Sequence, residues 1–195
     1  MNSPSELILA STSPYRRSLL ERLRLPFRAV APKVDEAHLP GESPEDRSLR
    51  LALAKAAAVA GQHPSAAVIG SDQVAVCDGR VLDKPGHASA AIEQLRHLSG
   101  RLARFHTAVA VQYLDGNVTD AFTDITEVRL RTLTTREIER YVELEQPFDC
   151  AGSFRSEALG CVLFEAVTSN DPTGLVGLPL IRVAASLRAL GFALP

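Results

Sequence analysis

Apolar residues along the chain alternate between short runs typical of buried strands and longer runs with the 3.6-residue period of helices. In the first third of the chain we expect, in order, strand 7–11, helix 14–23, strand 27–31 and helix 44–61. An apolar run at 66–69 predicts a buried strand, and Asp78-Gly79 is typical of a β-hairpin turn. Alternation of strands with helices predicts an α/β fold.

The second half of the chain continues this pattern with longer strands. The expected elements are helix 87–98, strands 104–114 and 119–133 joined at Asp115-Gly116, helix 134–144 and helix 178–190. Thr134 and Glu137 have the spacing of a capping box, which supports the start of the fourth helix. We therefore expect an α/β fold with a mixed, elongated twisted sheet flanked by helices, forming two lobes with a central cleft. The whole chain, 1–195, should form a single domain.

Charge and hydropathy narrow the class of partner. The chain has 195 residues, 46% of them hydrophobic, and its 21 basic residues nearly balance its 23 acidic ones. No cationic stripe suggests a long nucleic acid as ligand, although a small anionic ligand held by local charges is compatible with this balance. No uncharged stretch reaches the length of a membrane span, and the apolar run after Glu6 is too short for a signal peptide. We expect a soluble cytoplasmic protein.

Cysteine and histidine spacing predicts no metal site built on sulfur or imidazole. The three cysteines include no CxxC pair, which argues against a disulfide framework or thiolate zinc site and for a reducing compartment. The five histidines show no HExxH or similar spacing, so we assign them no role.

The segment between the first strand and the first helix has the composition of a phosphate site. Ser11 and Ser13 supply hydroxyls, Pro14 suits the first helical position, and Arg16 lies in the first turn. Backbone N–H groups at a helix N-terminus favour an anion, and a guanidinium can bind phosphate oxygens in a fork. The alternative is an ordinary N-cap with exposed arginines. The GxxxxGK[ST] phosphate loop occurs nowhere in the chain.

Carboxylates follow two of the expected strands, and lysines lie near them in sequence. Glu36 follows the strand 27–31, and Asp72 follows the buried run that ends near Gly70. Magnesium prefers oxygen ligands and often takes one or two protein carboxylates together with substrate phosphates, which Glu36 and Asp72 could supply. Lys55, the only cation in the alanine-rich stretch 51–60, and Lys84 could meet negative charge on a phosphate. The alternatives are solvated turns for the carboxylates and surface positions for the lysines.

Taken together, these motifs resemble the Maf family of nucleoside triphosphate pyrophosphatases over nearly the whole chain. The resemblance rests on the ordered segments 7–14 with Arg16, 34–36, 70–73, 84–85, 98–100 and 177–180. It implies an α/β fold like that of inosine triphosphatases, a divalent cation (Mg or Mn) and attack of water at the α-phosphorus. It also implies that Asp72 is the general base, with Glu36, Lys55, Lys84 and Arg16 lining the cleft.

The resemblance extends to one branch of the family. Members that act on thymidine and uridine triphosphates typically carry Arg after the Ser-Pro pair, Thr after the catalytic Asp, and a late Gln, whereas this chain has Tyr15, Gln73 and Glu157. Segments 149–154 and 171–173 resemble the branch that hydrolyses 7-methyl-GTP. Methylation at N7 makes guanine cationic, so the Tyr15 ring could attract it, while Glu157 could accept hydrogen bonds from the base edge.

Three functions follow as alternatives. The first is hydrolysis of 7-methyl-GTP to 7-methyl-GMP and diphosphate, which would remove a modified nucleotide. The second is the same reaction on dTTP or UTP. The third is a nucleotide-binding regulator of septum formation without significant catalysis, because Maf proteins are also associated with arrest of septum formation. The partner is a small nucleotide in each case, with no membrane and no long nucleic acid; the oligomeric state stays open, a homodimer being one alternative.

Overall fold

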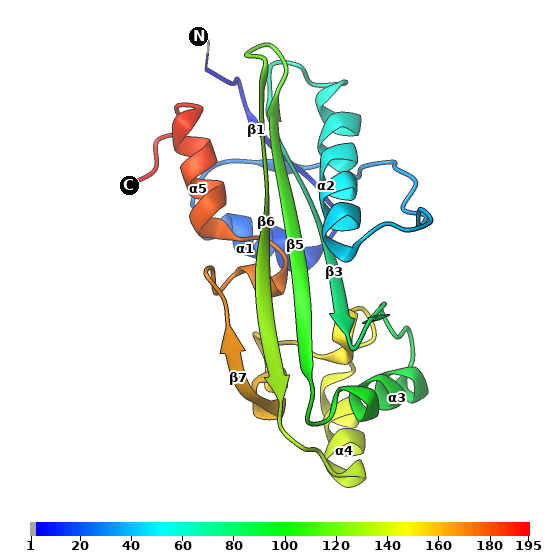
Figure 1. Cartoon of the computed structure of the whole chain (residues 1–195). Coiled ribbons are helices and arrows are strands. Elements are labelled where there is room, and N and C mark those ends of the chain that lie inside the picture. The colour runs from blue at the N-terminus through cyan, green and yellow to red at the C-terminus, as the bar shows by residue number, and fades with distance from the viewer. Residues whose placement is uncertain (1–2) are drawn as a thin grey trace. The chain divides into compact units, whose positions relative to one another are not determined.

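A computed structural model describes residues 3–195 of the chain (Figure 1). Its helices are α1 (Pro14–Glu21), α2 (Pro44–Ala60), α3 (Ala88–Leu98), α4 (Thr135–Glu145) and α5 (Leu180–Ala189). Its strands are β1 (Leu7–Ala10), β2 (Arg28–Ala29), β3 (Ala67–Cys77), β4 (Arg80–Val81), β5 (Leu102–Tyr113), β6 (Val118–Leu130) and β7 (Phe164–Thr168). Three short 3₁₀ helices are η1 (Ala151–Ser153), η2 (Leu159–Leu163) and η3 (Gly174–Val176). None of the helices in this described range is long and apolar enough to cross a membrane.

The sheet is mixed, which confirms the predicted α/β class. Its strand order is β2-β1-β3-β5-β6-β7, with β4 paired to β3. β1 runs parallel to β2 and β3, while β3 with β4 and β6 with β7 are antiparallel pairs. The parallel pairs are joined through helices, as parallel connections require.

The chain divides into two compact units. The first takes the residues up to Gln73 together with Thr107–Asp124 and Asp171–Pro195, and the second takes Val74–His106 and Ile125–Asn170. Strands β3, β5 and β6 contribute residues to both units. The expectation of one domain over 1–195, and that of a cleft between two lobes, therefore stay predictions.

In the first unit, helices cover both faces of the sheet (Figure 1). Leu7 and Leu9 of β1 pack with Leu19 and Leu20 of α1 and with residues of α5 in one apolar cluster. The intervening Ile8 packs on the other face with residues of α2. Because successive strand residues point to opposite faces, both faces of β1 are apolar and the strand is buried on each side.

Helix α2 lies unusually close to β3 because residue 70 is a glycine. A Cβ atom at Gly70 would lie 2.3 Å from the Ala52 carbonyl oxygen and 2.5 Å from the Ala56 nitrogen, both in the α2 backbone. Ala52 and Ala56 are fully buried. At this contact the helix presents small residues to a strand position that has no side chain. This contact brings the polar residues after Gly70 alongside α2.

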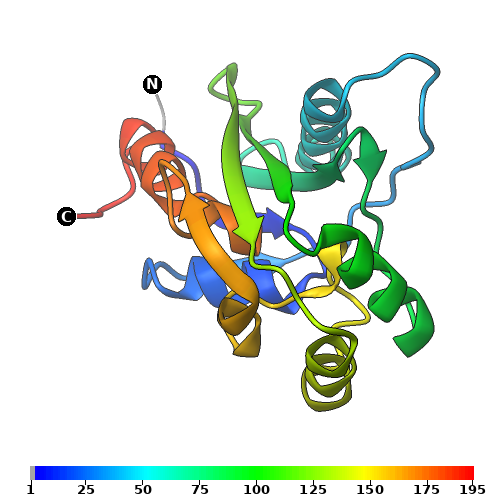
Figure 2. The same ribbon diagram turned by 60° about the horizontal axis from the view of Figure 1, so that its bottom comes forward.

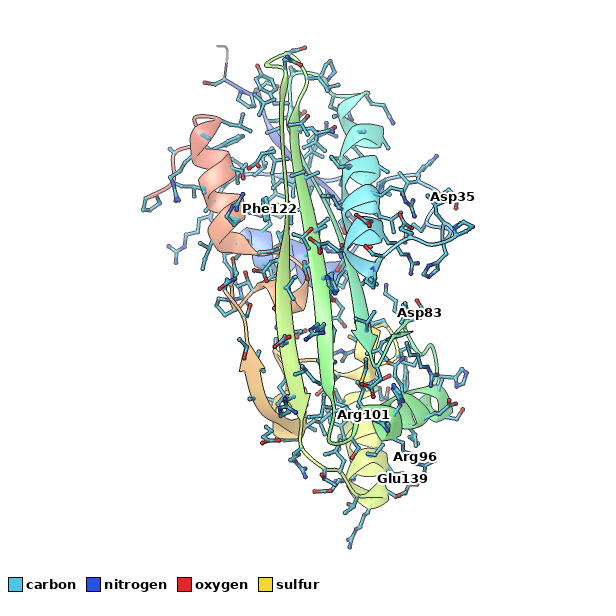
Figure 3. The ribbon with its side chains drawn as sticks, viewed as in Figure 1. Asp35, Asp83, Arg96, Arg101, Phe122 and Glu139 are labelled. Atoms are coloured by element: carbon cyan, nitrogen blue, oxygen red, sulfur yellow. The ribbon has the colours of Figure 1, made fainter. Side chains whose placement is uncertain are left out.

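In the second unit, α3 and α4 contact each other (Figure 2). Arg96 of α3 and Glu139 of α4 form an ion pair with 3.6 Å between Nη2 and Oε1 (Figure 3). The predicted capping box of α4 is present: Thr134 Oγ accepts from the Glu137 N–H, and Glu137 accepts from the Thr134 N–H. The hydrogen bond that the Glu137 carboxylate accepts from the Thr134 N–H, followed by those from the Thr134 hydroxyl and Arg131, lowers the pKa of Glu137 to about 2.

Two strand predictions needed correction. The strand expected at 66–69 continues to Cys77 as β3, because the polar residues that follow Gly70 are buried and find hydrogen-bond partners. The strand expected at 27–31 is reduced to Arg28–Ala29, and no regular element follows until Pro44. Pro32 and Pro40 fall in this stretch, and proline lacks the N–H that a strand ladder needs.

Replacing Gly70 with alanine should destabilise the protein by about 3 kcal/mol, because backbone atoms of α2 and β3 would have to separate. Gly61→Ala is the matched control: Gly61 ends α2 with φ −59°, and an added Cβ would lie 3.4 Å from its nearest neighbour. Gly61→Ala should change stability by less than about 1 kcal/mol. Urea unfolding measures both, and equal midpoints for the two variants would contradict the close approach.

Candidate active site

The turn between β1 and α1 presents the two hydroxyls singled out from the sequence. Ser13 is the N-cap of α1, where its Oγ accepts from the Arg16 N–H at 3.4 Å, and Pro14 occupies the first helical position. Ser11 Oγ accepts from the Ser13 N–H at 3.1 Å. Each hydroxyl thus uses its oxygen as an acceptor within the turn and retains an O–H that can donate to an anion. Ser11 is also buried, which makes the turn compact.

Lys55 joins the two carboxylates that the sequence marked as metal ligands. Its Nζ lies 2.6 Å from Asp72 Oδ1 and 2.8 Å from Glu36 Oε1. Lys55 and Asp72 are only 6% and 8% exposed, whereas the Glu36 side chain is 56% exposed. α2, β3 and the loop before α2 therefore bring an ammonium and two carboxylates together. A buried pair of this kind needs close geometry, because desolvation of the two charges opposes their attraction.

The alternation of side chains along β3 divides the polar residues between two faces. Val68 and Ile69 pack in clusters on opposite faces of the sheet, so Gly70 and Asp72 follow Val68 toward α2. Ser71 and Gln73 consequently share the face of α1, and their hydrogen bonds agree with this placement. This short segment of β3 thus places Asp72 in the charged cluster on one face of the sheet. On the other face it places Ser71 and Gln73 on the side of α1.

The carbonyl oxygen of Gly177 anchors Arg16. Arg16 Nε donates to it at 3.0 Å and Ser71 Oγ donates to it at 2.9 Å. Gly177 has φ +120°, and a Cβ there would lie 3.3 Å from Arg16 Nε, so glycine permits this approach. Burial lowers the pKa of the Arg16 guanidinium, while the charges of Asp72 and then Glu36 act in the opposite direction. Arg16 therefore belongs electrostatically to the carboxylate cluster.

Gln73 is engaged with the backbone of the same C-terminal segment. Its Nε2 donates toward Thr107 Oγ1 at 2.8 Å and toward the carbonyl oxygens of Leu175 at 3.1 Å and Gly174 at 3.2 Å. Thr107 Oγ1 in turn donates to the Gly174 oxygen at 3.0 Å. The amide nitrogen of Gln73 thus holds the η3 segment, and a direct contact with substrate by Gln73 stays a prediction.

Asp171 fixes the start of α5 and with it the segment that reaches Gly177. The Asp171 carboxylate, 2% exposed as a residue, accepts from Thr173 Oγ1 at 2.6 Å and from the Ile181 N–H at 2.6 Å. Thr173 Oγ1 also lies 2.8 Å from the Leu178 oxygen and accepts from the Leu180 N–H at 2.8 Å. The sequence marked this segment only through its family resemblance, because a backbone carbonyl that anchors an arginine leaves no signal in residue type.

The remaining candidate residues are placed as follows. Tyr15 is half-buried in the first turn of α1, within the first unit. Lys84 and Glu157 are exposed residues of the second unit, where Ser156 Oγ donates to Glu157 Oε2 at 3.3 Å. The charged cluster of the first unit therefore contains Glu36, Lys55 and Asp72, with Arg16 beside it. The roles of Tyr15, Lys84 and Glu157 stay predictions.

The donor set of this cluster fits a hard divalent cation. Glu36 and Asp72 offer carboxylate oxygens, the ligands that Mg²⁺ and Mn²⁺ prefer, and both contact the same ammonium. That ammonium shows that the position between the two carboxylates already favours a positive charge.

These observations define an α/β protein in which a hydroxyl-lined helix N-terminus, a guanidinium and a lysine–carboxylate cluster lie within one compact unit, a combination suited to a small phosphorylated ligand. Over residues 6–190 the chain matches the family described as Maf-like protein. The chain belongs to this family, which confirms the resemblance drawn from its motifs.

Relatives of similar length match nearly end to end. A 7-methyl-GTP pyrophosphatase of Xanthomonas campestris pv. campestris (strain 8004) is 56% identical over 97% of this chain and 98% of its own. Proteins of the same name from Bordetella pertussis and Aromatoleum aromaticum are each 52% identical, covering 96% and 98% of this chain and 94% and 98% of their own. Among solved structures, the Staphylococcus aureus Ham1 protein matches with 19% identity and a TM-score of 0.46, over 65% of this chain and 72% of its own.

Removing the Lys55 ammonium should be costly, because Asp72 would remain a buried carboxylate without its partner. We expect Lys55→Met to lower the free energy of unfolding by about 3–5 kcal/mol. Glu36→Gln should lower it by less than about 1 kcal/mol, since the Glu36 side chain is largely solvated. Adding Asp72→Asn to Lys55→Met should restore much of the loss, as measured by chemical denaturation at neutral pH. A double variant no more stable than Lys55→Met would show that packing of the lysine stem, rather than pairing of charges, sets the cost.

Proposed function

We propose that this chain is a nucleoside triphosphate pyrophosphatase that hydrolyses 7-methyl-GTP to 7-methyl-GMP and diphosphate. The observation that carries the proposal is the cluster of Lys55 with Asp72 and Glu36 next to Arg16, in a chain whose relatives at 52–56% identity bear the name 7-methyl-GTP pyrophosphatase. The reaction cuts a phosphoanhydride bond, so the enzyme is a hydrolase.

In this proposal the chain's own residues divide the work between proton transfer and charge neutralisation. Asp72 accepts a proton from the water that attacks the α-phosphorus. Arg16 and Lys55 neutralise charge that builds toward the leaving diphosphate, a role that the family resemblance also gives to Lys84. The hydroxyls of Ser11 and Ser13 donate to phosphate oxygens at the N-terminus of α1.

Glu36 and Asp72 are the residues that would hold a divalent cation. A cation such as Mg²⁺ or Mn²⁺ held there would supply positive charge beside the substrate phosphates. Arg16 also supplies positive charge, and the hydrogen bond from its Nε to the Gly177 oxygen restrains the guanidinium.

Recognition of the methylated base follows from charge. N7 methylation makes guanine cationic, and the half-buried Tyr15 ring at the head of α1 offers a face that attracts a cation. Glu157 accepts from the N1–H and N2–H₂ groups of guanine, which uracil and thymine lack as a pair. Gln73 contributes by holding the η3 segment.

The place of action in this proposal is the cytoplasm. No disulfide joins Cys77, Cys150 or Cys161 in the described part of the chain, and thiols persist in a reducing compartment. Hydrolysis there would keep a modified nucleotide out of the precursor pool for nucleic acids.

Asp72→Asn should lower kcat for 7-methyl-GTP by about a hundredfold or more while nucleotide binding changes little, because an amide cannot act as the base. Diphosphate release with Mg²⁺ or Mn²⁺ measures turnover, and calorimetric titration with a non-hydrolysable analogue measures binding. Asp115→Asn, an equal change of charge at the exposed β5–β6 turn, is the control. No diphosphate release by the unaltered protein from any methylated or ordinary triphosphate would instead favour a nucleotide-binding regulator.

Glu157→Gln should reduce kcat/KM for 7-methyl-GTP about tenfold relative to that for UTP, because one charged acceptor for the base edge is lost. Glu165→Gln provides the control, since Glu165 is an exposed glutamate on β7 of the same unit. An equal effect of Glu157→Gln on both substrates, or a preference of the unaltered protein for UTP or dTTP, would move the chain to the pyrimidine-specific alternative.

A further inference from the structure

The second unit holds a cluster of three metal-binding side chains that the nucleotide reaction does not use. Cys77 ends β3, Asp78 begins the turn to β4, and His97 lies in the last turn of α3. One ligand atom from each side chain lies within 4.8 Å of those of the other two. Within the described chain, this is the group of His, Cys, Asp and Glu residues that meets this separation.

The three donors come together for separate structural reasons. Asp78 and Gly79 have φ +48° and +76°, the left-handed pair of a two-residue hairpin turn, and Cys77 pairs with Arg80 across that hairpin. His97 approaches from α3, and its Nε2 lies 3.4 Å from the Cys77 carbonyl oxygen. The hairpin and the helix therefore fix the relative positions of thiol, carboxylate and imidazole before any ligand binds.

The chemistry of these donors selects a borderline or soft cation. Sulfur and imidazole nitrogen suit Zn²⁺, whereas Mg²⁺ and Mn²⁺ prefer oxygen. Three protein ligands leave a fourth tetrahedral position for water. The carboxylate cluster of Glu36 and Asp72 in the first unit contains no sulfur or imidazole, so the two groups of donors should differ in the metals they accept.

Arg101 already supplies positive charge at this position. Its Nε lies 3.1 Å from Asp78 Oδ2, and its Nη1 lies 3.3 Å from His97 Nδ1 and also contacts the His97 carbonyl oxygen. Its side chain is 45% exposed, and Arg101 lies between α3 and β5, where Figure 3 labels it. A metal dication and the guanidinium would therefore compete for the same carboxylate and imidazole, and Arg101 can move into solvent when a metal enters.

We propose that Cys77, Asp78 and His97 form a zinc-binding site in which the cation replaces the Arg101 guanidinium. Binding breaks the Cys77 S–H bond, releases the proton to solvent and forms a metal–sulfur bond without any change of oxidation state. The bound metal links the β3–β4 hairpin to the end of α3. The site is separate in residues and donor chemistry from the proposed nucleotide reaction, and it would exist even if that proposed reaction were wrong.

Cobalt provides the test, because Co²⁺ enters zinc sites and a cobalt–thiolate bond absorbs in the near ultraviolet. The full chain, freed of metal by chelation and kept reduced, is titrated with Co²⁺ and then with Zn²⁺. We expect the thiolate band to saturate at one equivalent of cobalt and to disappear when zinc displaces the cobalt. Cys77→Ser should abolish the band, and His97→Ala or Asp78→Asn should weaken cobalt binding about tenfold or more.

Arg101→Gln gives the sharpest prediction, since removal of the competing guanidinium should tighten cobalt binding several-fold, the opposite of the effect of each ligand variant. Cys161→Ser removes an exposed cysteine elsewhere in the second unit and is the matched control, while Asp72→Asn tests the oxygen cluster; both should keep the band. Circular dichroism checks folding, and His97→Ala decides the question if the buried Cys77→Ser variant does not fold. Absence of a thiolate band with excess cobalt, or a band that survives in folded Cys77→Ser, would overturn the proposal.

Discussion

The contact of the Lys55 ammonium with Asp72 and Glu36 is the interaction on which the organisation of the first unit depends. Lys55 lies on an alanine-rich helix, and both Lys55 and Asp72 are buried, so each charge has little water to solvate it. Each is tolerated because the other lies 2.6 Å away. That distance requires α2 to approach β3 closely, which the absence of a side chain at Gly70 allows. The Lys55–Asp72 pair therefore depends on the glycine at position 70. The loop that carries Glu36 adds a solvated carboxylate to the pair.

The opposite face of β3 is organised by backbone carbonyl groups. Ser71 and Gln73 donate to carbonyl oxygens of residues 174–177, and Arg16 shares the Gly177 oxygen with Ser71. Backbone oxygens cannot move without the segment that carries them, and Asp171 ties that segment to the N-terminus of α5. Arg16 is thus held at a site built from residues more than a hundred positions apart. Such preorganisation is what electrostatic stabilisation of a phosphate transition state requires, since the groups need no reorientation during reaction.

The second unit has a different chemical character. Its helices α3 and α4 contact each other and carry the partly exposed ion pair of Arg96 with Glu139, and the group of Cys77, Asp78 and His97 lies beside Arg101. Exposed pairs of this kind contribute little to stability individually because water screens them. Lys84 and Glu157, which family resemblance associates with phosphate and base, also belong to this unit. Within the proposed function, charge chemistry on the phosphates is concentrated in the first unit, which holds Arg16, Lys55 and Asp72.

The sequence by itself determined the α/β class, the order of most elements and several local signals, because these depend on periodicity and on capping residues close together in the chain. Ser13 with Pro14 at α1 and Thr134 with Glu137 at α4 are local in this sense. Motif order also sufficed to recognise the Maf family. Only the tertiary structure decided that Glu36 and Asp72 share one ammonium, that Gly177 anchors Arg16, and that Cys77 meets His97. These relations join segments distant in sequence, and the backbone groups that carry some of them have the same chemistry at every position, so residue identity alone gives no signal of them.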